Sequence, residues 1–101
     1  VITGLAIVNT DTGESVQGGE RTAVTFRALS DGEIQRFVDI VQPMDRAGAY
    51  TVDGPGSLLV AHYDGCYQNV LGLPIVKLDQ LLRDFDITLF DHLDEKRATF
   101  L

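Results

Sequence analysis

Two stretches in the first third of the chain have the hydrophobic pattern of β-strands. Residues 1–8 (VITGLAIV) are apolar and rich in β-branched side chains, and residues 21–29 (RTAVTFRAL) alternate between apolar and polar positions. Between them, NTDTGES at 9–15 is dense in turn-forming residues. The pattern predicts that the two strands pair as an antiparallel hairpin through a long, glycine-rich connection.

The segment after residue 29 carries the clearest helix signal. Ser30 is followed three residues later by Glu33, which is the capping-box arrangement at a helix N-terminus. Pro43 disfavours helical geometry at the residue before it and so ends the predicted helix. The apolar residues between these signals recur at helical spacing and form one stripe: Ile34, Phe37, Val38 and Val41.

The rest of the chain predicts a strand, a second helix and a short last strand. Residues 57–63 (SLLVAHY) form a buried strand that ends at a turn, and residues 66–70 (CYQNV) are a candidate for further pairing. Pro74 marks the first turn of the second helix, and DITLF at 86–90 is a last strand. The order predicts an α/β fold, a mixed sheet with flanking helices. The inward residues of the second helix are Ile75, Leu78, Leu81, Leu82 and Phe85.

Composition narrows the class of protein. The 101 residues form one domain, 1–101, and a hydrophobic content of 45% is typical of a globular protein. A formal charge of -7 argues against nucleic-acid binding, and no apolar run is long enough to span a membrane. The lone Cys66 cannot form an internal disulfide, so we expect a cytoplasmic protein. Because the chain opens on an apolar segment without an initiator methionine, we interpret it as part of something longer.

Residue chemistry alone predicts no catalytic set and no metal site in this segment. His62 and His92 have no partner at metal-ligand spacing, and Cys66 has no nearby histidine to activate it. The aspartates form no close pair of the kind used in acid–base catalysis.

One connection, PMDRAGAYTVDGPG at residues 43–56, has an unusual mixture of residues. Its glycines permit close backbone approach or positive φ, and Arg46 and Asp53 supply a donor and an acceptor. An ionised Asp53 accepts hydrogen bonds only, so it suits a ligand that presents N–H groups, such as the edge of a nucleobase. Two interpretations stay open from these residues: an Asp–Arg ion pair beside a β-turn, or the wall of a binding site.

Three motifs, in order and correctly spaced, make residues 4–85 resemble the C-terminal half of the Maf family, nucleotide pyrophosphatases related to a septum-formation inhibitor. ERTAVTFRALSDGEIQRFV is similar to the family's strand and Ser-Asp-x-Glu-Ile helix. PMDRAGAYTVDGPGSLLV is similar to its Pro-x-Asp-Lys-Ala-Gly-Ala-Tyr-x-Ile-Gln-Gly block. DGCYQNVLGLPIVKLDQLL is similar to its Gly-x-Tyr-x-Asn-Val-x-Gly-Leu-Pro element and last helix.

The resemblance implies a two-lobed α/β fold, shaped like that of inosine triphosphatases, with the substrate in a cleft. It implies hydrolysis of a nucleoside triphosphate to the monophosphate and pyrophosphate, with a divalent cation (Mg or Mn) as cofactor. The implied partners are the nucleotide, the N-terminal half of the same protein and, in a dimer, a second copy. The family is also linked to arrest of septum formation.

The resemblance assigns roles only to positions of this sequence that align with the family's motifs. The family's phosphate-binding Ser-x-Ser-Pro-Arg-Arg motif, catalytic aspartate and lysines belong to its upstream half, so no catalytic or metal residue transfers to this segment. Asp53 stands where the family has a glutamine that selects dTTP and UTP, or a glutamate that selects a modified nucleotide. Arg46 replaces the usual lysine, and Tyr50 and Gly54 complete the candidate substrate cleft.

Two alternative functions therefore follow from the sequence. In the first, the parent protein is a nucleotide pyrophosphatase acting on a dTTP/UTP-like or modified nucleotide, this segment supplies base recognition, and the segment alone is inactive. In the second, the fold is kept as a non-catalytic nucleotide-binding or interaction module. The aspartate at position 53, which matches neither family residue, motivates the second.

Overall fold

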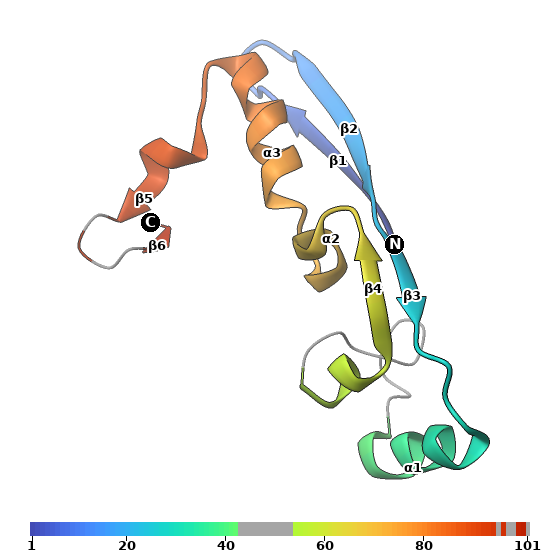
Figure 1. Cartoon of the computed structure of the whole chain (residues 1–101). Coiled ribbons are helices and arrows are strands. Elements are labelled where there is room, and N and C mark those ends of the chain that lie inside the picture. The colour runs from blue at the N-terminus through green and yellow to red at the C-terminus, as the bar shows by residue number, and fades with distance from the viewer. Residues whose placement is uncertain (43–53, 95, 97–98, 101) are drawn as a thin grey trace. The chain divides into compact units, whose positions relative to one another are not determined.

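The computed structural model describes residues 1–42, 54–94, 96 and 99–100 (Figure 1). The chain divides into two compact units: unit 1 comprises residues 1–21 and 66–101, and unit 2 comprises residues 22–65. The strands of the described residues form three two-stranded antiparallel sheets. The predicted α/β class is confirmed, and the strand pairing differs from the prediction.

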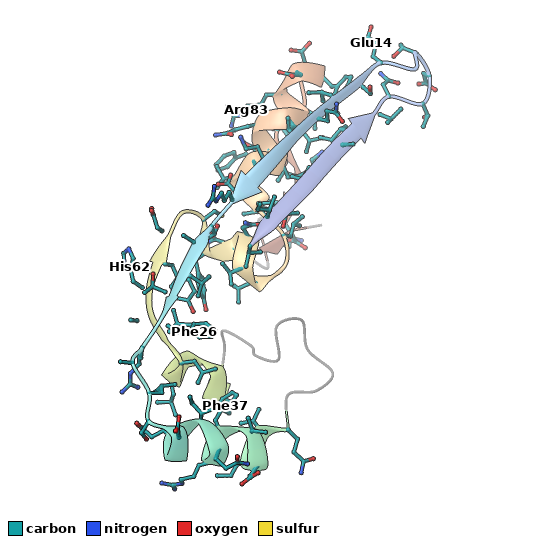
Figure 2. The ribbon with its side chains drawn as sticks, turned by 90° about the vertical axis from the view of Figure 1, so that its right-hand side faces the viewer. Glu14, Phe26, Phe37, His62 and Arg83 are labelled. Atoms are coloured by element: carbon teal, nitrogen blue, oxygen red, sulfur yellow. The ribbon has the colours of Figure 1, made fainter. Side chains whose placement is uncertain are left out.

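Unit 1 is built on a ribbon of two seven-residue strands. Strand β1 (Ile2–Val8) pairs with β2 (Ser15–Arg21), with Ile2 opposite Arg21 and Val8 opposite Ser15. Two backbone bonds close the turn between them, from the N–H of Asn9 to the carbonyl of Glu14 and from Gly13 to the carbonyl of Asn9, both 2.8 Å. Gly13 adopts a φ of 77°, which glycine adopts without steric cost. Glu14 marks the tip of this turn in Figure 2.

Helix α3 (Ile75–Leu82) covers one face of the ribbon, and Figure 1 shows it lying along β1 and β2. Because side chains alternate along a strand, every second residue of each strand lies on this half-buried face. Gly18 leaves room for the helix: a β-carbon there would lie 3.3 Å from Cδ2 of Leu81 and 3.7 Å from Cδ of Lys77. The half-buried residues of the ribbon are Thr3, Leu5, Ile7, Val16, Gly18 and Glu20.

A short helix, α2 (Tyr67–Leu71), precedes α3. It ends at Gly72, whose φ of 141° lies in the region that favours glycine. Pro74 is buried and forms the N-cap of α3, as the sequence predicts for a proline at the start of a helix. The predicted inward positions of α3 are all half-buried.

After α3 the chain is held back against the helix by one carboxylate. A 3-10 turn, η4 (Arg83–Phe85), is followed by η5 (Leu89–His92) and by the β5–β6 pair (Leu93–Asp94 with Thr99–Phe100). Asp79 of α3 accepts the backbone N–H of Leu89 at 2.8 Å and the hydroxyl of Thr88 at 3.3 Å. It also forms a 3.0 Å ion pair with Arg83, one helical turn away.

Unit 2 contains a second antiparallel pair. Strand β3 (Ala23–Phe26) pairs with β4 (Val60–Asp64), and the register shifts between Thr25 and Phe26. The backbone N–H of Arg27 continues the pairing by donating to the carbonyl of Leu59 at 2.8 Å. Leu59, 8% exposed, is the buried large apolar side chain of the described residues.

The predicted first helix is confirmed as α1 (Asp31–Val41). Both bonds of the capping box are present: the N–H of Glu33 donates to the Ser30 hydroxyl at 3.1 Å, and the N–H of Ser30 donates to the Glu33 carboxylate at 3.0 Å. Gln42 leaves the helical region with φ 50°, and its N–H still donates to the carbonyl of Val38. The helix therefore ends immediately before Pro43, where the sequence predicts.

The predicted pairing of residues 1–8 with residues 21–29 is wrong. The partner of β1 is β2, which occupies the stretch expected to be a glycine-rich connection, and β3 pairs with β4 instead. Two adjacent glycines in SVQGGER lower its intrinsic strand preference. Packing against α3 overrides that preference, because the missing side chain at Gly18 is what admits Leu81.

Three local predictions in the second half of the chain are also corrected. Residues 66–70 contribute to helix α2 and not to a strand, and the strand predicted to start at 57 begins at Val60, after a 3-10 turn. The DITLF segment is not a strand either. Asp86 adopts φ 58°, and Thr88 then caps η5 by accepting the N–H of Phe90 at 3.3 Å.

The close fit at Gly18 yields a test of the packing in unit 1. We expect Gly18→Val to lower the free energy of unfolding by about 1–3 kcal/mol, because the added carbons would push against Leu81. Gly19→Val is the matched control. A β-carbon at Gly19 meets only the carbonyl oxygen of Thr3, at 3.5 Å, so we expect a change within about 0.5 kcal/mol. Urea unfolding of both variants makes the measurement, and equal effects would contradict the packing argument.

The bonds at Asp79 predict a pH dependence of stability. The Leu89 N–H above all, then the hydrogen bond and charge of Arg83, hold the pKa of this carboxyl below its usual range, although desolvation opposes them. A depressed folded-state pKa stabilises the fold above the unfolded-state pKa, and this contribution is lost as pH falls through the folded-state value. Asp79→Asn should therefore be less stable than wild type at neutral pH.

The difference between wild type and Asp79→Asn should shrink as the solution is acidified below the usual carboxyl range. Urea unfolding midpoints across pH provide the measurement. Asp84→Asn, at an exposed position of η4, makes the same change of charge nearby and should leave the pH profile unchanged. A constant difference between Asp79→Asn and wild type at all pH values would contradict the assignment.

Candidate functional site

Most of the candidate cleft predicted from sequence lies outside the described residues. Arg46, Tyr50 and Asp53 fall within residues 43–53, and Gly54 is the one candidate that the structure describes. The site is therefore described from the two elements that border this segment, α1 before it and the 3-10 turn η3 (Gly54–Leu58) after it.

Gly54 begins η3 with a φ of 52°, in the left-handed region that favours glycine. Its carbonyl accepts the hydroxyl of Ser57 at 2.6 Å, which closes the turn. A β-carbon at Gly54 would meet nothing within 4 Å, so the residue is required by its backbone conformation and not by crowding. The backbone directly after position 53 is thus set in a tight turn.

A groove of about 330 Å³ lies in unit 2 beside this turn. Its walls are mainly apolar, and Phe37, labelled in Figure 2, comes from the face of α1 that lines it. Ile40 and Leu58 remain 75% and 62% exposed. The complete lining is Arg27, Leu29, Glu33, Arg36, Phe37, Ile40, Val41, Pro55, Leu58 and Leu59.

Arg27 links the strand to the turn on one side of the groove. Its Nη1 donates to the carbonyl of Leu58 at 2.9 Å, while its backbone N–H donates to the carbonyl of Leu59. The planar guanidinium carries further donors beyond the one used here. Arg27 therefore fixes the end of η3 and places a positive charge at the groove.

Glu33 places a negative charge at the same groove and has a structural role. The N–H of Ser30, then its hydroxyl, lower the pKa of this carboxyl, and the charge of Arg27 adds to the effect, against desolvation. Glu33 is therefore ionised at neutral pH, and its capping contribution would be lost only as pH falls through the lowered pKa. Its proton is not available for acid catalysis near neutrality.

A mainly apolar groove with arginines in its lining suits a flat, partly apolar group that also presents hydrogen-bond acceptors. The arginines are Arg27, from the end of β3, and Arg36, from α1. Sequence reasoning did not single out either residue. The available signal was weak: Arg27 continues the alternating pattern after β3, and Arg36 reads as an ordinary polar position of α1.

The other reactive side chains do not meet in a catalytic arrangement among the described residues. His62 is exposed on β4 opposite Thr25, and His92 is exposed at the end of η5. The thiol of Cys66 lies 3.4 Å from the side-chain oxygen of Gln68. The described part of the chain holds no group of three metal-ligating residues, so we derive no metal-dependent step from it.

A second groove lies in unit 1, and its described lining contains no catalytic arrangement of side chains. It measures about 320 Å³ and is lined by Ile75, Val76, Asp79, Leu89, Phe90 and Leu93. Asp79, its charged member, is 16% exposed and is engaged by Arg83, Thr88 and Leu89. Sequence analysis did not single out this aspartate, because its partners at 88 and 89 are contacts of tertiary structure.

Comparison with known proteins gives a consistent result. The family model described as Maf-like protein matches residues 1–85. A dTTP/UTP pyrophosphatase of Alkaliphilus oremlandii is 48% identical over 90 residues, which are 88% of this chain and 47% of the relative. A dTTP/UTP pyrophosphatase of Acetivibrio thermocellus is 43% identical over 89 residues, 88% of this chain and 44% of the relative. The chain spans a little less than half the length of these curated relatives.

Proposed function

We propose that this chain, which belongs to the Maf-like protein family, is part of a nucleoside triphosphate pyrophosphatase. The observation that carries the proposal is the identity of 43% and 48% with relatives named dTTP/UTP pyrophosphatase, over 88% of this chain in each case. Family membership confirms the resemblance read from the three sequence motifs. The activity and substrate of the whole protein are the proposal.

In the proposed reaction a water molecule attacks the α-phosphorus of a nucleoside triphosphate. The bond from this phosphorus to the oxygen bridging to the β-phosphate breaks, and the products are the monophosphate and pyrophosphate. A carboxylate takes the proton of the attacking water. A divalent cation, Mg or Mn, stabilises the developing negative charge when bound. We assign these catalytic groups to the part of the protein beyond these 101 residues.

We assign base recognition to this 101-residue chain, with Asp53 as the selective residue. Asp53 immediately precedes the tight turn at Gly54, and Arg27 anchors the far end of that turn at Leu58. A turn held at both ends is a suitable support for a selective side chain, because a recognition group must keep its geometry to discriminate. Arg46 and Tyr50 complete the proposed substrate cleft.

The carboxylate at position 53 determines which hydrogen bonds this residue can form with a nucleobase. Asp53 can accept from N3–H of uracil or thymine, or from N1–H and N2–H of guanine. Unlike an amide, it cannot donate to a pyrimidine carbonyl. The proposed substrate is therefore a dTTP/UTP-like or modified nucleotide in which the N–H contact dominates.

The wider setting follows from the same proposal. The whole protein would have two lobes around a cleft, as in inosine triphosphatases, with the N-terminal half completing the site and a homodimer as the assembly. Among the described residues, no helix is long and apolar enough to cross a membrane. We place the enzyme in the cytoplasm, and a role in septum formation is part of the family-based proposal.

The activity itself is tested by pyrophosphate release from a panel of nucleoside triphosphates. We expect turnover by the full-length protein and none by the 101 residues alone, because the catalytic groups lie outside them. Calorimetry with the same nucleotides separates the two functions. Nucleotide binding without any turnover by the full-length protein would instead support the non-catalytic module, and turnover by the fragment would show that the catalytic groups are misplaced.

The role of Asp53 is tested by Asp53→Gln in the full-length protein. The amide restores a donor for a pyrimidine carbonyl, so we expect kcat/KM for dTTP and UTP to rise about tenfold relative to other nucleotides. Asp64→Asn, a carboxyl-to-amide change at an exposed end of β4, serves as the control and should leave the profile unchanged. An unchanged profile for Asp53→Gln would remove Asp53 from base selection.

A further inference from the structure

We propose that the open edge of strand β1 is a pairing surface for a further β-strand, which is supplied by the part of the full-length protein outside these 101 residues. The ribbon of β1 and β2 then belongs to a larger sheet, with β1 as an inner strand. The proposal rests on one part of the proposed function, namely that this chain is part of a longer protein. It does not depend on the activity, and it concerns unit 1 alone.

Strand β1 has one paired edge and one open edge among the described residues. Its partner is β2, and no other described strand pairs with it. The N–H of Asn9, just after β1, donates to the carbonyl of Glu14, just before β2. Because bonded and non-bonded pairs alternate along an antiparallel ladder, positions 3, 5 and 7 of β1 are the ones bonded to β2. The backbone groups that face the open edge are those of Ile2, Gly4, Ala6 and Val8.

The sequence of β1 has none of the features that protect an open strand edge in water. Natural edge strands carry charges or prolines, contain a bulge or are short. ITGLAIV is seven residues long and has no charged residue and no proline, and its register with β2 is unbroken. A flat apolar strand of this length is a template for pairing with another strand when its edge is left open.

The side chains of β1 also indicate an inner strand. Leu5 and Ile7 are half-buried on the face that α3 covers. On the opposite face, Ile2 and Val8 are 76% and 57% exposed. A strand with one face in water alternates between apolar and polar residues, whereas a strand that is buried on both faces is apolar throughout. Strand β1 follows the second pattern.

Strand β2 of the same ribbon has the opposite character. SVQGGER carries the charged residues Glu20 and Arg21 and two adjacent glycines, and Val16 is its one large apolar residue. Charges and glycines at an edge discourage further pairing. The contrast between the two strands places the additional strand at β1 and not at β2.

The open edge belongs to a ribbon that is held in place. Helix α3 packs on one face of the ribbon, with Leu81 against Gly18. At the end away from the turn, Nδ2 of Asn69 donates to the carbonyl of Val1 at 3.2 Å and to that of Glu20 at 3.3 Å, and Asn69 is 1% exposed. A preformed edge lowers the entropic cost of strand addition, because only the incoming strand has to be ordered.

Two observations favour a strand of the same protein over a second copy. The chain spans less than half the length of the two relatives compared above, so the whole protein has ample chain to supply a strand. The edge itself is small: seven residues at about 3.4 Å each, in a sheet about 10 Å thick, present roughly 240 Å². Stable association of separate copies buries about 800 Å² per partner. A strand of the same polypeptide is exempt from most of the entropic cost of association.

The first experiment measures hydrogen exchange of the β1 backbone amides by NMR in the unmodified full-length protein. With a strand on the open edge, the N–H groups of Gly4 and Ala6 are bonded, as are those of Leu5 and Ile7 to β2. We therefore expect all four amides to be protected from exchange to within about tenfold of one another. Protection that alternates along β1, with rapid exchange at Gly4 and Ala6, would overturn the proposal.

The second experiment identifies the occupant of the edge. Cross-strand nuclear Overhauser effects from the amides of Gly4 and Ala6 are recorded in isotopically labelled full-length protein and in a mixture of labelled and unlabelled copies. We expect contacts to residues outside these 101, and no contacts between labelled and unlabelled copies. Contacts between copies would assign the edge to a dimer, and contacts to residues 22–65 would assign it to unit 2; either result overturns the proposal.

The third experiment compares Ala6→Pro with Gln17→Pro in the full-length protein. The two residues are opposite each other in a non-bonded pair, so each N–H points to the outer edge of its own strand. Proline removes that N–H, which an open edge tolerates and a paired edge does not. We expect Ala6→Pro to lower Tm by at least about 5 °C more than Gln17→Pro does. Equal shifts would contradict the proposal.

The exchange measurement decides the proposal even if Ala6→Pro does not fold, because it uses the unmodified protein. None of the three measurements depends on turnover. Absence of pyrophosphate release would therefore defeat the proposed function and leave the test of the β1 edge intact.

Discussion

Unit 1 depends on how an isolated two-stranded ribbon covers its apolar face. Two strands by themselves are marginally stable in water, so the half-buried face of β1 and β2 must pack against another element. Helix α3 provides that cover, and it approaches closely because Gly18 presents no side chain to Leu81. The carboxylate of Asp79 then holds the following residues against the same helix. Ribbon, helix and C-terminal segment are thus linked through α3.

Unit 2 is organised differently, because its side-chain bonds stabilise the start of its helix and link its strand to the η3 turn. The capping box fixes the start of α1, and Arg27 ties the end of β3 to η3. Much of the apolar face of α1 remains open as a groove, with Ile40 and Leu58 exposed. Unit 1 is therefore the more closely packed part around its helix, and unit 2 leaves an open surface beside the η3 turn.

Local signals with a short-range cause were predicted correctly. The capping box at Ser30 and Glu33 needs residues three apart, and the helix start at Pro74 needs one proline, so both can be recognised in the sequence. The sequence did not predict which strands pair. SVQGGER reads as a connection because glycine weakens strands, and only α3 makes it a strand. A positive φ at Gly54 was one of the two possibilities that its residue type suggested, whereas the side chains of Arg27 and Asn69 bond carbonyls far away in sequence.

The sequence by itself determined the family, the two longest helices and the identity of the unusual residue at position 53, because motifs, caps and side-chain chemistry depend on neighbours along the chain. The tertiary structure alone decided which strands pair, which glycine must stay small and which carbonyls the Asn69 amide bonds. Those features depend on contacts between residues far apart in sequence. The hydrogen bond between Asn69 and Glu20, for example, joins residues 49 positions apart, and no local pattern encodes such a contact.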